Sequence, residues 1–146
     1  MNYYWDCIKD VFENVSIYDG AERFLQDFAK QPAWIGDLFA VNWFLSEMSN
    51  GGIMQFFDND TGVLAPEAMM GFRHMNLPEH AALLDQAMKY LGDEYPRDRE
   101  QRNLITSKLP MTTFKDLEKQ MYLLGGSNLG KIYDVMDSYA EKNAKS

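Results

Sequence analysis

The sequence predicts an all-α protein, a single globular domain of about seven or eight helices packed around a central helix. Apolar residues recur at the three- and four-residue spacing of a helix face in nearly every segment, and strand-like alternation occurs almost nowhere. The chain has 146 residues, 46% of them apolar, which supplies one core but not two ordinary domains. We expect one domain over residues 1–146, with a minor lobe boundary near residues 93–102 as the alternative.

Three helices are predicted in the first third of the chain. The first covers residues 4–15, and its apolar stripe consists of Tyr4, Ile8, Val11 and Val15. A second follows Asp19 and ends before Pro32, because the residue before a proline is biased away from helical geometry. The longest covers residues 33–49. Its broad apolar surface predicts the central helix, and is formed by Trp34, Leu38, Phe39, Val41, Trp43, Leu45 and Met48.

Glycine and proline divide the rest of the chain into further helices. The Asn50-Gly51-Gly52 sequence ends the central helix with a left-handed residue, and a short helical turn follows over residues 53–57. Pro66 and Pro78 lie near the starts of two more helices, a position that proline favours. Residues 93–102 are highly charged and predict an exposed connection, in which a short helix after Pro96 is also considered. Two C-terminal helices have the apolar stripes Phe114, Leu117, Met121, Leu124 and Leu129, Ile132, Met136, Tyr139.

The charge of the chain disfavours direct binding to nucleic acid or to an anionic membrane. Its net charge is −8, and residues 1–94 contain 15 acidic and 5 basic side chains, whereas residues 95–146 contain 7 and 9. Both phosphate backbones and anionic lipids attract clustered Lys and Arg rather than carboxylates. The acidity is therefore regional, and it favours a basic protein as partner.

The chain shows features expected of a cytoplasmic protein. Cys7 is the only cysteine, so an internal disulfide and a cysteine-based zinc site are both excluded. No secretory signal pattern begins the chain, and no run of 18 apolar residues predicts a membrane span. We expect a protein of a reducing compartment with no membrane association.

The usual signatures of catalysis and of cofactor or metal binding are missing. His74 and His80 lie six residues apart across a predicted helix break, which is not the spacing of two ligands on one helix face. The Asp58-x-Asp60-x-Gly62 sequence departs from a calcium loop after its first carboxylates and predicts an ordinary Asx turn. We expect no metal, no cofactor and no catalytic residue.

One stretch resembles a family signature. Residues 47–59 match the pattern Glu-x-x-Asn-Gly-Gly-x-x-Gln-aromatic-aromatic-x-Asn, which is similar to that of the bacterial DNA-mimic protein (DMP) family of small helical proteins. The resemblance covers about residues 37–91 well and the C-terminal helices loosely. It implies an all-α fold and, from one member of the family, an acidic homodimer that occupies the DNA-binding face of a transcriptional regulator.

Two groups of candidate residues follow. Carboxylates three or four positions apart on a helix stand roughly 5–6 Å from each other, a spacing comparable with that of successive phosphates, and Asp6, Asp10 and Glu13 have this spacing. The candidate partner-binding carboxylates are Asp6, Asp10, Glu13, Asp19, Glu22, Asp27 and Asp37. The signature residues, for which we expect a structural role around the glycine turn, are Glu47, Asn50, Gly51, Gly52, Gln55 and Asn59.

The sequence leaves three functions open. The first is a non-enzymatic DNA mimic that blocks the basic surface of a DNA-binding protein or transcriptional regulator. The second is an immunity-type inhibitor of a basic toxin or nuclease, which needs the same anionic face. The third, less favoured, is an enzyme with a pocket near Glu47 and Gln55, where polar side chains are embedded among aromatic residues.

Overall fold

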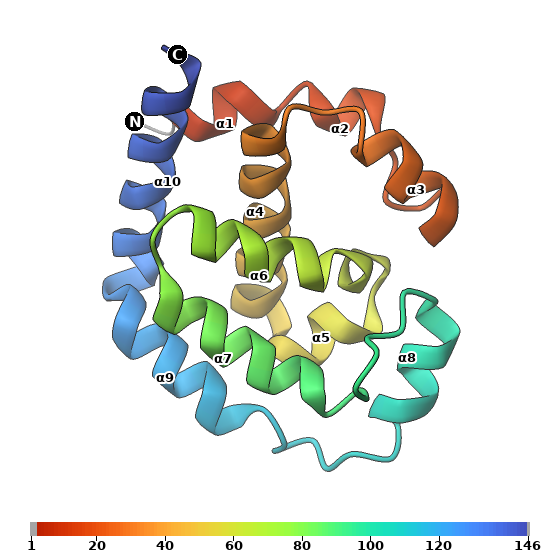
Figure 1. The fold of residues 1–146 in the computed structure, drawn as a ribbon. Coiled ribbons are helices and arrows are strands. Elements are labelled where there is room, and N and C mark those ends of the chain that lie inside the picture. The colour runs from red at the N-terminus through yellow and green to blue at the C-terminus, as the bar shows by residue number, and fades with distance from the viewer. Residues whose placement is uncertain (1–2, 146) are drawn as a thin grey trace.

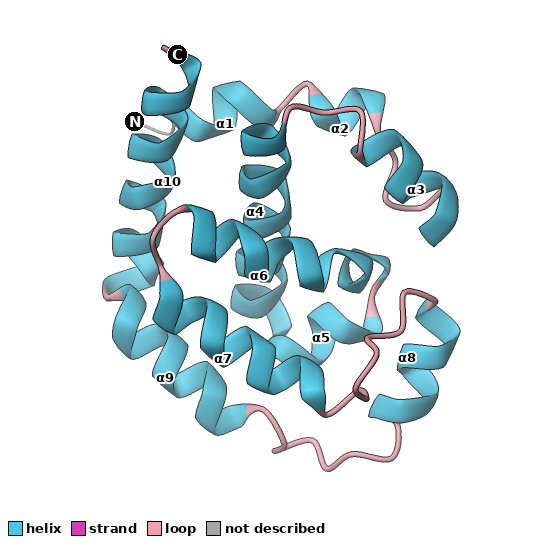
Figure 2. Cartoon of the chain, viewed as in Figure 1, coloured by secondary structure: helices cyan, strands magenta, loops and turns pink. Residues whose placement is uncertain are grey.

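The computed structural model describes residues 3–145, and that part of the chain is built from helices and loops without a strand (Figure 2). The α-helices are α1 (Tyr3–Ile8), α2 (Val11–Asn14), α3 (Ala21–Phe28), α4 (Ala33–Gly51), α5 (Ile53–Asp58), α6 (Ala65–His74), α7 (Pro78–Lys89), α8 (Arg99–Thr106), α9 (Lys115–Gly125) and α10 (Gly130–Ala144), and two short 3-10 helices are η1 (Asp60–Leu64) and η2 (Ser127–Leu129). The predicted all-α class is confirmed. None of the helices in residues 3–145 has the length and hydropathy needed to cross a bilayer.

Helix α4 is the central helix, as predicted. It stands in the middle of the fold with the other helices around it (Figure 1). A helix that is apolar around most of its circumference must be covered on several sides to remove that surface from water. Its buried residues are Ile35, Gly36, Asp37, Leu38, Phe39, Ala40, Val41, Phe44, Leu45 and Met48.

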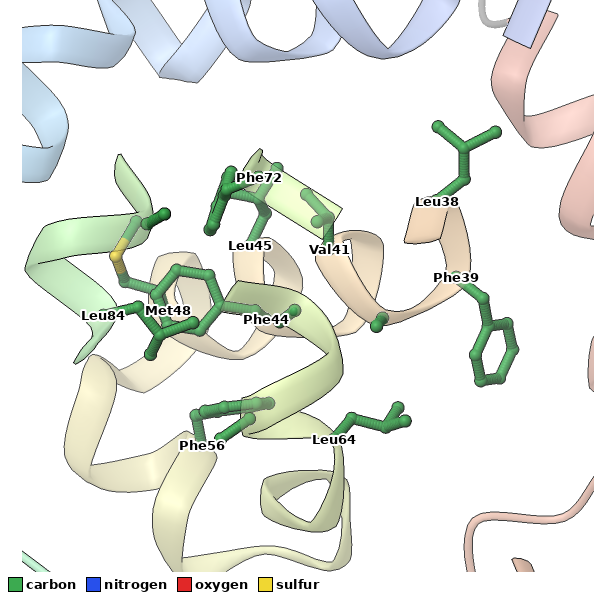
Figure 3. Packing of buried hydrophobic residues seen from close by; sticks show 14 of the residues in the cluster. Leu38, Phe39, Val41, Phe44, Leu45, Met48, Phe56, Leu64, Phe72 and Leu84 are labelled. Atoms are coloured by element: carbon green, nitrogen blue, oxygen red, sulfur yellow. The ribbon is translucent and has the colours of Figure 1, made fainter. Parts of the chain in front are cut away.

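Helix α6 crosses α4 at close range (Figure 1). A side chain at Gly71 would contact Val41 Cγ2 at 2.9 Å and the Asp37 carbonyl oxygen at 3.0 Å, so the missing side chain of this glycine allows the two backbones to approach. Phe44 lies edge-on to Phe72, with ring centroids 5.9 Å apart, on the side of α4 that α6 covers (Figure 3). Helices α7 and α9 extend this side outward, and α1 and α10 cover another side of α4.

The N-terminal segment differs from the predicted single helix over residues 4–15. It forms α1 and α2, with Asp10 as the residue before α2. The break lets Tyr4 stack on Tyr133 of α10 at 5.9 Å, while Phe12 packs against Trp43 of α4 at 5.6 Å. Two neighbouring helices are thus contacted by one bent segment, and its predicted apolar stripe is still buried.

The charged stretch 93–102 is not simply the exposed connection that we expected, because Arg102 is completely buried. Its guanidinium donates from Nε to the Phe57 carbonyl at 2.9 Å and from Nη2 to the Asn59 carbonyl at 2.8 Å. Its Nη1 donates to the Arg97 carbonyl at 2.6 Å and to the Pro96 carbonyl at 3.3 Å. The Arg102 side chain therefore connects α8 with the end of α5 and with the loop before α8.

Replacing Arg102 by methionine should destabilise the fold strongly. The change leaves several carbonyl oxygens around the former guanidinium without a donor, so we expect the free energy of unfolding to fall by roughly 2–4 kcal/mol, measured by urea denaturation. The matched control is Arg99→Met, because the Arg99 side chain is 46% exposed and bonds Asp58 and Asp60 near the surface. This control should cost about 1 kcal/mol or less. Equal losses for the two variants would contradict the structural role of Arg102.

His80 should make the protein less stable in mild acid. The side chain is buried, stacks on Phe72, and has no hydrogen-bond partner for either ring nitrogen among the described residues. Burial lowers the pKa of His80 below its ordinary value of 6.5, and the neighbouring Glu79 opposes this only partly. Near pH 6.5 the unfolded chain therefore binds a proton at His80 more readily than the folded protein does. The free energy of unfolding falls as the pH drops below 6.5.

The test of His80 is to measure the free energy of unfolding of wild type and His80→Leu at several pH values from about 7.5 to about 5. Wild type should lose more stability over this range than the variant, since leucine cannot be protonated. A control variant, His74→Leu, removes the more exposed imidazole. Parallel curves for wild type and His80→Leu would show that His80 does not contribute to acid sensitivity.

Candidate functional site

Exposed carboxylates are distributed along the N-terminal segment of residues 3–28, which we call the acidic arm. The arm consists of α1, α2 and α3 with their connections (Figure 1). Four of its carboxylates are exposed and have no ion-pair partner among the described residues: Asp10, Glu13, Asp19 and Glu22. A basic partner could pair with these groups without first breaking an internal ion pair.

The two other candidate carboxylates of the arm have neighbouring cations. Asp6 lies 3.5 Å from Lys9 Nζ. Asp27 is half-buried and lies 3.7 Å from Arg23 Nε and 3.5 Å from Lys30 Nζ. The cations of these pairs are largely exposed, and such pairs are weak and screened by salt. Asp6 and Asp27 are therefore partly neutralised within the chain.

The expected row of carboxylates on one helix is wrong. Asp6 belongs to α1, Glu13 belongs to α2, and Asp10 lies between the two helices. The regular spacing assumed for a continuous helix does not apply across this break. Any resemblance of the acidic arm to a row of phosphates must come from its tertiary path.

Asp37 is also placed wrongly by the sequence prediction, because it is buried rather than part of an exposed acidic surface. Its carboxylate lies 2.9 Å from His74 Nδ1 and accepts a hydrogen bond of 2.7 Å from the Tyr139 hydroxyl. These contacts connect α4 with the end of α6 and with α10. Burial and the bond to Asp37 raise the pKa of Tyr139, so the phenol keeps its proton at neutral pH. Asp37 has a structural role and is not available to a partner.

The family signature lies where α4 meets α5. Asn59 Nδ2 donates to Glu47 Oε2 at 2.6 Å, which ties the residue after α5 to the last turns of α4. The Gln55 side chain lies against Gly51. Asn50 is exposed, and the partner of Glu47 within the described residues is Asn59 rather than Asn50 or Gln55. The hydrogen bond at this junction thus joins Glu47 to Asn59, and the side chains of Asn50 and Gln55 take no part in it.

Glu118 completes this turn and was not found from the sequence. Gly52 has φ +93, and a side chain there would collide with Glu118 Oε1. The same oxygen accepts a hydrogen bond of 2.8 Å from the backbone N–H of Ile53. Glu118 is 65 positions from Ile53 along the chain, so no local pattern indicates that its carboxylate caps the first turn of α5.

The groove beside α4 is not the pocket that was expected near Glu47 and Gln55 for an enzyme. That groove has a volume of about 740 Å³ and its polar side chains are Asn42, Ser46, Ser49 and Asn50. Neither Glu47 nor Gln55 lines it. The half-buried Glu47 carboxylate is engaged by Asn59 instead.

The carboxylates of residues 58–60 are used within the fold. Asp58 accepts a hydrogen bond from the Thr106 hydroxyl, and Asp60 lies 3.2 Å from Arg99 Nη1. Across residues 3–145, no group of three or more His, Cys, Asp and Glu side chains is arranged to hold a metal ion. The Asp58 to Gly62 sequence forms the end of α5 and the start of η1.

Replacing Gly52 by alanine should destabilise the α4–α5 junction more than the same change at a second glycine. Gly20 has nearly the same backbone geometry, with φ +90, but has nothing within 4 Å of the added side chain. Gly20→Ala therefore measures the backbone strain alone, which costs about 1–2 kcal/mol. Gly52→Ala adds the collision with Glu118 and should cost about 1 kcal/mol more. Equal losses in urea denaturation would exclude a role for Glu118 at this turn.

The comparisons with known proteins identify one family. The family model described as DMP19-like protein matches residues 29–143. The search of curated proteins and the search of solved structures each found no match. The matched range contains the signature, the Asp37 contacts and Arg102, and it leaves the whole acidic arm outside. Because the match covers most of the chain, this protein belongs to the DMP19-like protein family.

Proposed function

We propose that this protein is a binding protein that blocks the basic surface of a DNA-binding protein or transcriptional regulator by presenting carboxylates in place of DNA phosphates. The observation that carries the proposal is the set of four exposed and unpaired carboxylates on the acidic arm: Asp10, Glu13, Asp19 and Glu22. The partner would be a protein, since the net charge of −8 repels nucleic acid and anionic lipid.

The energetics of the acidic arm suit recognition of a basic surface. Its exposed carboxylates keep their hydration in the free protein and gain Coulomb energy when cations approach. Complementary charge accelerates encounter and makes association strongly dependent on salt. Asp6 and Asp27, which have internal partners, should contribute less than the four unpaired groups.

Family membership supports the fold beneath this surface rather than the surface itself. The family match begins at residue 29, and all four unpaired carboxylates precede it. Exposed carboxylates can be exchanged without disturbing a core, so the mimicry inferred from one family member does not extend automatically to another. The proposal therefore depends on the residues of this chain.

The decisive experiment neutralises the four carboxylates together in D10N/E13Q/D19N/E22Q. Immobilised wild type should capture DNA-binding proteins from a native bacterial lysate at low salt and release them when duplex DNA is added. The variant should lose most of this DNA-competed capture, because the side-chain sizes are nearly kept and only the charge is removed. Captured proteins are identified and quantified by mass spectrometry.

A matched control keeps the number of neutralised charges and changes their position. The variant E79Q/D93N/E94Q/E100Q alters four exposed carboxylates outside the acidic arm, and it should retain capture. The proposal is wrong if duplex DNA releases nothing from wild type. The assignment to the acidic arm is wrong if both variants lose capture equally.

A further inference from the structure

The groove beside α4 combines aromatic walls with a neutral polar floor. One wall contains Trp5, Phe12 and Trp43, whose successive ring centroids are 5.4 and 5.6 Å apart. Tyr4, stacked on Tyr133, also lines the groove. Burial raises the pKa of Tyr4 to about 12, so its hydroxyl remains protonated and lies 3.4 Å from Asn42 Oδ1. The groove is open, and Trp5 is 42% exposed.

The floor of the groove consists of polar side chains on one face of α4. Ser46, Ser49 and Asn50 have the spacing of neighbours on a helix, are exposed, and line the groove. None of these three side chains is hydrogen-bonded to another described residue. Their oxygens are therefore free to accept hydrogen bonds from a ligand.

Among residues 3–145 no charged side chain lines the groove, but the helices that form it are acidic. Helices α1, α2, α4 and α10 shape the groove. Apart from the buried Asp37, these helices carry six carboxylates and two lysines: Asp6, Glu13, Glu47, Asp134, Asp137 and Glu141 against Lys131 and Lys142. Lys9 and Lys145, just beyond the ends of α1 and α10, pair with Asp6 and Glu141. Four carboxylates against two lysines remain. A positively charged ligand would therefore be attracted to these helices.

We propose that this groove receives arginine side chains of a basic protein partner. A guanidinium is planar, stacks on aromatic faces, and donates several hydrogen bonds in one plane. The groove offers both complements, with Trp5 and Trp43 for stacking and the α4 oxygens as acceptors. The volume of about 740 Å³ exceeds the size of one side chain, so a segment with more than one residue fits. The identity of the partner rests on the proposed function, whereas the chemistry of the groove is tested separately.

The test titrates the isotope-labelled full-length protein with three blocked pentapeptides and follows amide chemical shifts. The peptides are Gly-Arg-Gly-Arg-Gly, the same peptide with lysine, and the same peptide with citrulline, which keeps the planar shape but is neutral. The arginine peptide should bind about tenfold more tightly than the citrulline peptide and several-fold more tightly than the lysine peptide. Its shifts should concentrate on groove residues. Equal binding of the arginine and lysine peptides would overturn the proposal, because charge alone would then explain it.

Two variants locate the binding site. Trp5→Leu removes an exposed ring from the groove and should weaken the arginine peptide about fivefold. Tyr18→Leu is the matched control, because Tyr18 is 75% exposed and does not line the groove; it should leave the affinity unchanged. If Trp5→Leu binds as wild type does, the groove is not the arginine site.

The same variants separate this inference from the proposed function. In one outcome, D10N/E13Q/D19N/E22Q loses DNA-competed capture, whereas Trp5→Leu keeps both this capture and its peptide binding. The proposed function then stands, and the groove is rejected as the arginine site. Arginine-selective binding that depends on Trp5, without any DNA-competed capture by wild type, would keep the groove and remove the proposed function. Loss of both activities in Trp5→Leu would support a groove that anchors the basic partner.

Discussion

The burial of α4 is the constraint on which the rest of the structure depends. An extended helix with apolar side chains around most of its circumference is stable in water only when other helices cover it. Helix α6 covers one side through the close approach at Gly71, and α1 and α10 cover another. The exposed polar side chains Ser46, Ser49 and Asn50 of the C-terminal half of α4 line the groove. The distribution of apolar and polar side chains on α4 thus accounts for both the core and the groove.

Polar side chains then fix helices that hydrophobic packing alone would position loosely. Arg102 donates hydrogen bonds to carbonyls at the end of α5 and in the loop before α8. Glu118, on α9, caps the first turn of α5. Asp37 joins α4 to α6 and α10. Each is a polar group removed at least partly from water, and such groups are tolerated when their bonds are satisfied. These directional contacts specify the arrangement of the helices.

The outer surface is free of this constraint, and charge dominates it. On the acidic arm, apolar residues such as Val11 are buried against the core while Asp10 and Glu13 remain in water. Function on such a surface depends on long-range attraction and on a few contacts that exclude water. Trp5 and Phe12 of the groove and the unpaired Asp10 and Glu13 belong to the same segment, α1 to α2, so charge for attraction and rings for anchoring are available together.

The sequence by itself determined the helical class, the central position of residues 33–49, the burial of the apolar stripes and the regional acidity, because these follow from periodicity and composition. Tertiary structure decided which polar groups remain on the surface. In the sequence, Asp37 is not distinguished from the exposed carboxylates, but in the structure it is buried and bonded to His74 and Tyr139. Arg102 likewise belongs to a charged stretch in the sequence but is buried in the structure. The break between α1 and α2 likewise followed from packing on two helices at once. The partners in these contacts are far apart in sequence, so only the packing of the helices brings them together.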